Sequence, residues 1–133
     1  MVRAGWRGVG GRGLARSGRR GRSAPLSARL ARACEEVNRY IREGWGGSLH
    51  KEGRCRWEEG GRAVLVELLL FAPSAEATLD LLDFVFSQLG RRAEDIRRIL
   101  ERHGIAVERI EIDVRVGGSV AEVAIRFRVA PSS

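Results

Sequence analysis

The residues best suited to bind a charged ligand are the arginines that crowd the first 25 positions. They are Arg3, Arg7, Arg12, Arg16, Arg19, Arg20 and Arg22. A guanidinium group can pair bidentately with a phosphate and can stack on a base. The seven glycines between these arginines would let the backbone follow an irregular strand, and no acidic residue opposes them. We therefore expect the segment to contact RNA or a ribonucleoprotein, with a strong salt dependence.

The excess of positive charge lies entirely in this segment. The chain of 133 residues has a formal net charge of +7, and residues 26–133 hold equal numbers of basic and acidic residues. Because a low-complexity Arg/Gly stretch cannot bury enough apolar surface to offset its ordering entropy, we expect a disordered tail over residues 1–25 and a single domain over 26–133. Three other interpretations stay open: an idle solvated extension, translated DNA upstream of the true start, and an organellar presequence.

A second candidate contact lies between two expected helices, at Gly90-Arg91-Arg92. The order α-β-β-α-Gly-loop-α-β resembles the type II KH domain and the ribosome-binding factor A family. In KH domains a Gly-x-x-Gly loop lies against the nucleic-acid backbone. The resemblance implies that Gly90 corresponds to the first glycine and Arg91-Arg92 to the basic middle pair, while Ala93 replaces the second glycine. A structural joint between two helices is the alternative explanation.

Other kinds of chemistry find little support. Cys34 and Cys55 stand apart, without Cys-x-x-Cys or His-x₃₋₅-His spacing, so we expect no metal site, no cofactor and no catalytic residue. We expect Cys34 to behave as a small buried hydrophobic residue, in a reducing cytosol where two cysteines do not form a disulfide framework. The chain is thus predicted to be non-enzymatic, cytoplasmic and not membrane-bound.

The composition also points to a thermophilic source. The sequence contains abundant charge and only one residue each of the thermolabile types methionine, asparagine and glutamine: Met1, Asn38 and Gln88.

The periodicity predicts an α+β fold in the order α-β-β-α-α-β-β, with three helices and a mostly antiparallel four-stranded sheet made of two hairpins. The expected elements are a helix from Leu26 to Gly44, strands over Leu49–Glu58 and Arg62–Phe71, helices over Ser74–Leu89 and Arg92–His103, and a hairpin over Val107–Val129. The first strand is polar on one side and is expected at an edge. The second is almost continuously apolar, which is typical of a central strand covered on both faces.

The helical spacing also predicts which side chains are buried. For the first helix the expected apolar stripe is Leu26, Leu30, Ala33/Cys34, Val37 and Ile41. For the helix that begins at Ser74, the proposed N-cap, the expected buried stripe is Ala75, Leu79, Leu82, Phe86 and Leu89, widened by Leu81, Phe84 and Val85. For the next helix the residues expected to point inward are Ala93, Ile96, Ile99 and Leu100. Gly90 is expected to interrupt the two helices.

Charge pairing predicts the register of the last hairpin. A loop of Gly118-Ser119 places Arg115 opposite Glu122 and Glu111 opposite Arg126, whereas a one-residue slip would place Asp113 opposite Glu122, where the two carboxylates repel. The same register aligns three apolar pairs: Val114 with Val123, Ile112 with Ile125, and Ile110 with Phe127.

Two functions follow from these patterns. The first is a small RNA- or ribonucleoprotein-binding protein that uses the Arg/Gly segment and the Gly90–Arg92 stretch. The second is a non-enzymatic structural or assembly protein that forms homo-oligomers through an edge of the sheet or binds a protein partner.

Overall fold

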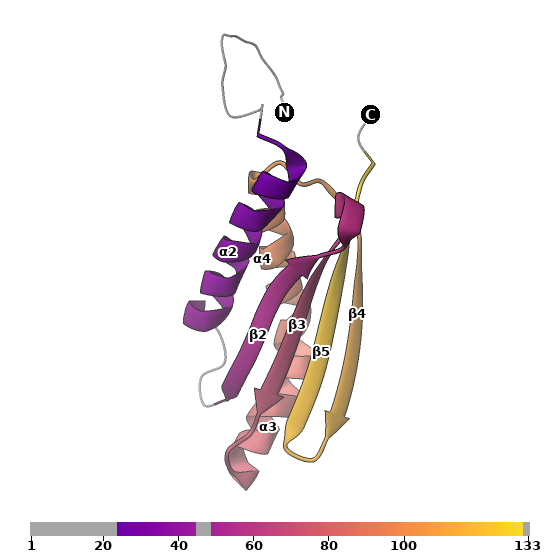
Figure 1. The fold of residues 1–133 in the computed structure, drawn as a ribbon. Helices are drawn as coiled ribbons and strands as arrows, with labels where there is room; N and C mark the ends of the chain where they lie inside the picture. Colours follow the sequence, from indigo (N-terminus) through magenta and orange to yellow (C-terminus); the bar gives the residue numbers. More distant parts are fainter. Residues whose placement is uncertain (1–23, 45–48, 132–133) are drawn as a thin grey trace.

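The computed structural model describes residues 24–44 and 49–131 of the chain. The elements follow the predicted α+β order, and four antiparallel strands form one sheet in the order β2-β3-β5-β4 (Figure 1). The strands are β2 (His50–Trp57), β3 (Ala63–Phe71), β4 (Val107–Gly117) and β5 (Val120–Val129). The first hairpin therefore supplies one edge and a central strand, and the second hairpin supplies the other edge.

The first helix, α2 (Leu26–Gly44), lies along β2 and next to α4 (Leu89–Arg102). Its apolar stripe is buried as the spacing predicts: Leu30, Ala33, Cys34, Val37 and Ile41 are each at most 4% exposed. Gly53 on β2 gives room for this packing, because a Cβ at that position would lie 2.5 Å from a Leu68 side-chain atom and 3.3 Å from Ile41. A small residue here lets α2 approach the sheet closely.

The two helices expected after Pro73 form one continuous helical segment. It runs from α3 (Ala75–Asp83) through a π-helical turn, η3 (Phe84–Gln88), directly into α4. The helix count is therefore two rather than three. The predicted interruption at Gly90 is wrong, because Gly90 lies inside α4 at a place where the surroundings are open. A helical glycine costs only about 1 kcal/mol relative to alanine, and the flanking helix outweighs that cost.

The π turn also changes which face of the segment is buried. The buried residues are Ala77, Leu81, Phe84, Leu89, Ala93, Ile96, Ile99 and Leu100. The expected stripe on the first helix is thus wrong at Ala75, Leu79 and Phe86, which are exposed, Leu79 by 71% and Phe86 by 81%. The residues expected to widen the stripe include Leu81 and Phe84, and both of these are buried. The stripe expected on the second helix is confirmed. The predicted N-cap is also confirmed: Ser74 Oγ accepts a hydrogen bond of 3.1 Å from the Ala77 N–H.

The register of the second hairpin is as predicted. Arg115 is aligned with Glu122 and Glu111 with Arg126, around a loop in which Gly118 has φ +61°. Gly118 supplies the left-handed conformation that this short loop needs. The predicted apolar pairs are aligned as well, Val114 with Val123, Ile112 with Ile125 and Ile110 with Phe127.

The helices of residues 24–44 and 49–131 all lie on one face of the sheet, and the central strand β3 is covered by helices on that side alone (Figure 1). The expectation that both its faces are covered by other elements is wrong. Leu65 still retains only 8% exposure on the open face. Its neighbours in register are Arg56 and Arg126, long side chains whose aliphatic parts can cover apolar surface.

Cys34 and Cys55 form a disulfide, with Cα atoms 5.1 Å apart, so the expectation of free cysteines is wrong. Cys34 lies on the buried stripe of α2, and Cys55 is an inward-facing residue of β2. The spacing of these two cysteines in the sequence gives no sign of their proximity. It arises because α2 folds back across β2, and the bond fastens the first helix to the sheet.

Candidate functional site

The seven arginines predicted to bind RNA, Arg3 to Arg22, lie outside the described residues. The remaining site residues, Gly90, Arg91 and Arg92, lie in the first turn of α4. This turn does not follow a loop. The Leu89 N–H donates to the Phe84 carbonyl of the π turn, so the helix start that a phosphate would approach is already occupied by helical hydrogen bonding.

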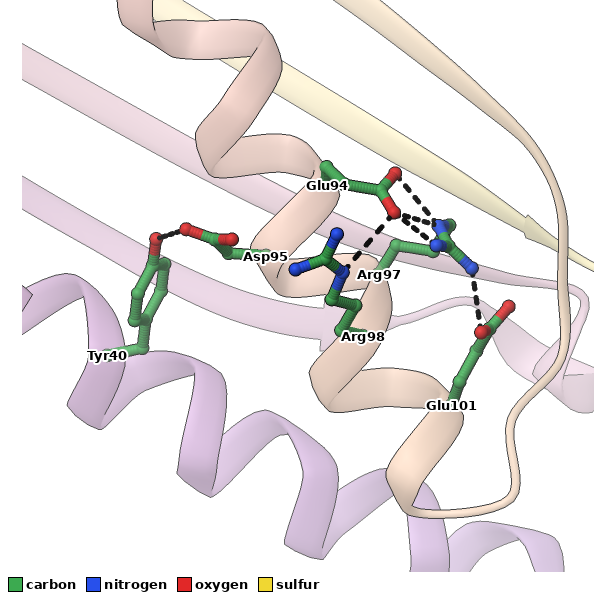
Figure 2. A network of polar contacts seen from close by, with 6 residues as sticks. All are labelled: Tyr40, Glu94, Asp95, Arg97, Arg98 and Glu101. Atoms are coloured by element: carbon green, nitrogen blue, oxygen red, sulfur yellow. Dashed lines mark hydrogen bonds and ion pairs between the residues drawn. The ribbon is translucent and has the colours of Figure 1, made fainter.

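Arg91 and Arg92 have different surroundings. Arg91 is exposed, whereas Arg92 is half-buried and its Nη1 donates a hydrogen bond of 3.2 Å to the Tyr40 hydroxyl. Tyr40 Oη in turn donates to Asp95 Oδ2 at 2.5 Å (Figure 2). Burial and the hydrogen bond to Asp95 raise the pKa of Tyr40 above its usual value. Tyr40 thus stays protonated and joins α2 to α4, and Arg92 is part of that contact.

The remaining charges of α4 mostly neutralise one another. Arg97 Nε lies 2.9 Å from Glu94 Oε1, and Arg97 Nη1 lies 2.7 Å from Glu101 Oε1 (Figure 2). Arg98 adds a longer contact of 3.6 Å to Glu94. The hydrogen bond from Arg97 lowers the pKa of Glu94, and the two carboxylates raise the pKa of Arg97. This helix surface is a network of opposite charges rather than a basic platform.

A second ion cluster joins the end of α4 to α2. Glu36 Oε1 lies 2.8 Å from His103 Nε2, and Glu36 Oε2 also binds Arg102. The hydrogen bond from His103 lowers the pKa of Glu36, against a smaller opposing effect of burial. The cluster stabilises the packing of two helices and leaves its carboxylate fully engaged.

The open face of the sheet carries a shallow hollow of about 530 Å³. Acidic residues and arginines alternate around it. The residues that give it charge are Glu52, Arg54, Glu67, Asp113, Arg115 and Glu122. Glu67 is paired with Arg56 at 3.1 Å and with Arg54 at 3.5 Å, and these hydrogen bonds lower its pKa. The mixture of signs gives no preference for a phosphate or for a cation.

Over residues 24–44 and 49–131, no group of three or more His, Cys, Asp or Glu side chains could hold a metal ion. The same residues contain no helix long and apolar enough to cross a membrane. Comparisons of the chain with protein-family models, with curated proteins and with solved structures find no match.

Sequence reasoning did not identify the outer edge of β4 as a site. On the side that faces the helices, Ile112 is 42% exposed and Val116 is 43% exposed. On the open side, Asp113 and Arg115 form no ion pair or side-chain hydrogen bond with any described residue. The alternation of apolar and charged residues was visible in the sequence. What it could not show is that β5 pairs with β3, which leaves β4 at the edge.

Proposed function

We propose that this protein binds RNA or a ribonucleoprotein through the arginines of residues 1–25, with the α+β domain as a neutral support. The observation that supports this is the distribution of charge. Residues 26–133 carry as many acidic as basic residues, and several of the described ones form ion pairs on α4, between α2 and α4, and on the open face of the sheet. The arginine segment is the part of the chain with unopposed positive charge.

Arg91 is a secondary part of this proposal. It is exposed on the first turn of α4, whereas Arg92 is held by Tyr40 and Gly90 offers only an open helix surface. The KH-like contact is therefore proposed in a reduced form, with Arg91 as the side chain able to reach a phosphate.

The proposal predicts a steep dependence of RNA affinity on salt. If all seven arginines of residues 1–22 neutralise phosphates of a single strand, the logarithm of the association constant should fall with the logarithm of salt concentration with a slope of about −5. Fluorescence anisotropy with a labelled single-stranded RNA, and with the same sequence as DNA, measures this slope for the full chain.

Three variants make the test specific. Replacement of the seven arginines by serine should remove most of the slope, whereas replacement by lysine preserves the charge and should retain most of it. Arg91→Ser should reduce the slope by about one unit if Arg91 contacts a phosphate. If the full chain binds no RNA at micromolar concentration near physiological salt, the proposal is wrong. If the serine variant binds as well as the full chain, the arginine segment is not the binding site.

We further propose that the protein works in the cytoplasm of a thermophile. The Cys34–Cys55 disulfide is compatible with that compartment, since intracellular proteins of hyperthermophiles are often rich in disulfides. The sparse content of methionine and side-chain amides supports the same source.

A second candidate function is a structural or assembly role. The observation that favours it is the outer edge of β4, where Ile112 and Val116 are more than two-fifths exposed and where Asp113 and Arg115 form no ion pair with the described residues.

A further inference from the structure

In the described part of the chain, no strand pairs with the outer edge of β4, which therefore presents a row of free backbone hydrogen-bonding groups. Gly117 and Val120 flank the two-residue loop of the hairpin and are paired across it. Because backbone groups alternate in direction along an antiparallel strand, those of Ile112, Val114 and Val116 point away from β5. An exposed edge of this kind is a ready template for another strand, and proteins usually shorten, bend or cover such edges.

Two of these side chains, Ile112 and Val116, lack cover, whereas Val114 is half-buried against the core. The two helical segments lie behind the other strands, and most of β4 extends beyond them at the right of Figure 1. Ile112 and Val116 consequently remain more than two-fifths exposed, although their partners on β5, Ile125 and Ala121, are fully buried. The strand thus presents apolar side chains and free backbone groups at the same positions.

Some of the charged side chains of β4 form ion pairs within the described residues, and others do not. Glu111 lies 2.9 Å from Arg109 and 3.5 Å from Arg128, so its charge is compensated within the chain. Asp113 and Arg115 have no such contact among residues 24–44 and 49–131. When two copies of such a strand pair about a two-fold axis, the acid of each copy can lie opposite the base of the other copy.

A two-fold axis through Val114 brings all these features together. An antiparallel pair of β4 strands centred there places Asp113 opposite Arg115 of the second copy, twice, and Ile112 opposite Val116, twice. Val114 meets its own copy at the centre. Each exposed apolar side chain gains an apolar neighbour, and each unpaired charge gains an opposite one.

Other registers are less favourable. Centring the pair on Glu111, Asp113 or Arg115 places that charged residue opposite itself, and centring it on Ile112 places Glu111 opposite Asp113. A register centred on Ile110 would have to cross the register shift between Val107 and Arg109, where the regular ladder is interrupted.

We propose that two copies of this chain associate through β4, in the antiparallel register centred on Val114, to form a continuous eight-stranded sheet. The inference rests on the second candidate function and not on RNA binding. The partner is a second copy because the free charges and apolar residues of β4 complement themselves about this axis.

Charge exchange at the two positions tests the register directly. Position 113 of one copy lies opposite position 115 of the other in this register. Asp113→Arg therefore places arginine opposite arginine at both contacts, and Arg115→Asp places aspartate opposite aspartate. Each change replaces two attractive cross-strand pairs by two repulsive ones, so the dimer dissociation constant should rise by about tenfold or more. Glu52→Arg is the matched control, since it makes the same charge change on the open face of the opposite edge strand.

The decisive samples are the mixtures and the double variant. Sedimentation equilibrium of the full chain, freed of nucleic acid, should give a dimer for the wild type and for Glu52→Arg, and weakened association for each single variant alone. An equimolar mixture of Asp113→Arg and Arg115→Asp should form a mixed dimer, and the double exchange should dimerise again. Circular dichroism shows whether each variant is folded, and restoration in the mixture excludes misfolding as the cause.

Three results would overturn the proposal in distinguishable ways. A wild-type chain that stays monomeric to high concentration removes the dimer and leaves an assembly role only with a different protein. A dimer that both single variants leave unchanged shows self-association through another surface. Variants that dissociate but do not restore each other on mixing contradict the register centred on Val114.

Discussion

The disulfide between Cys34 and Cys55 should supply a large share of the stability of this domain. Reduction of the bond changes the chain at one place only, and both sulfur-bearing side chains are at least nine-tenths buried, so the packing around them is otherwise kept. The sequence separation of 21 sets the size of the closed loop. In the chain-entropy treatment a loop of that length lowers the free energy of the folded state relative to the unfolded state by about 3 kcal/mol.

This magnitude is easy to measure. Unfolding in guanidinium chloride, followed by circular dichroism, should give a free energy of unfolding about 3 kcal/mol lower with a reductant than without it. That difference corresponds to a change of roughly a hundredfold or more in the unfolding equilibrium constant. The slope of free energy against denaturant should rise modestly, because the reduced unfolded chain is less compact.

A variant without thiols provides the control. Cys34→Ala combined with Cys55→Ala should unfold at the same midpoint with and without reductant, which assigns the effect in the wild type to this bond. The reasoning is refuted if the wild-type midpoint is insensitive to reductant while mass spectrometry shows two free thiols. It is also refuted if non-reducing mass spectrometry of the untreated protein finds no disulfide.

Two further predictions concern the core and the ion pairs. Ile96→Ala should lower the free energy of unfolding by about 2–5 kcal/mol, because Ile96 is fully buried. Phe86→Ala should change it by less than about 0.5 kcal/mol, because Phe86 is 81% exposed. Equal losses for the two variants in denaturant unfolding would contradict the observed burial of this helical segment. The pKa of Glu36 is lowered from 4.5 in the folded state, so its contribution to stability is present above that pH and is lost as the pH falls through the folded pKa. The melting temperature of Glu36→Gln should therefore fall less than that of the wild type between pH 6 and about pH 3. An equal fall in the two proteins would show that the cluster with His103 contributes nothing to stability.

The sequence predicted the element order and the register of the last hairpin because both follow from local patterns. Alternation, turn glycines and the pairing of Glu111 with Arg126 act between neighbouring segments, so they can be read without knowledge of the tertiary structure. The α2 stripe was predictable for the same reason, since Leu30 to Ile41 keep one helical period.

The features that escaped prediction depend on contacts between distant segments. The Cys34–Cys55 bond requires α2 to cross β2, and the edge position of β4 requires β5 to pair with β3. The stripe containing Leu79 and Phe86 was misassigned because an uninterrupted 3.6-residue period does not allow for a π turn. Of the candidate site residues, Gly90, Arg91 and Arg92 lie in the described part of the chain. They were expected to form a loop, but they are part of the continuous helix α4.

The π turn has a consequence for how this chain can change its length. The inward positions step by four and three residues up to Phe84, by five to Leu89, and by four and three again beyond it. The helix thus holds one more residue than a regular α-helix needs between those two positions. Loss of a single exposed residue such as Ser87 would convert the wide turn into an ordinary one and keep every buried side chain on its face. A deletion in the middle of a helix usually turns the following side chains away from the core. Within this turn a deletion of one residue should instead leave the buried side chains in place.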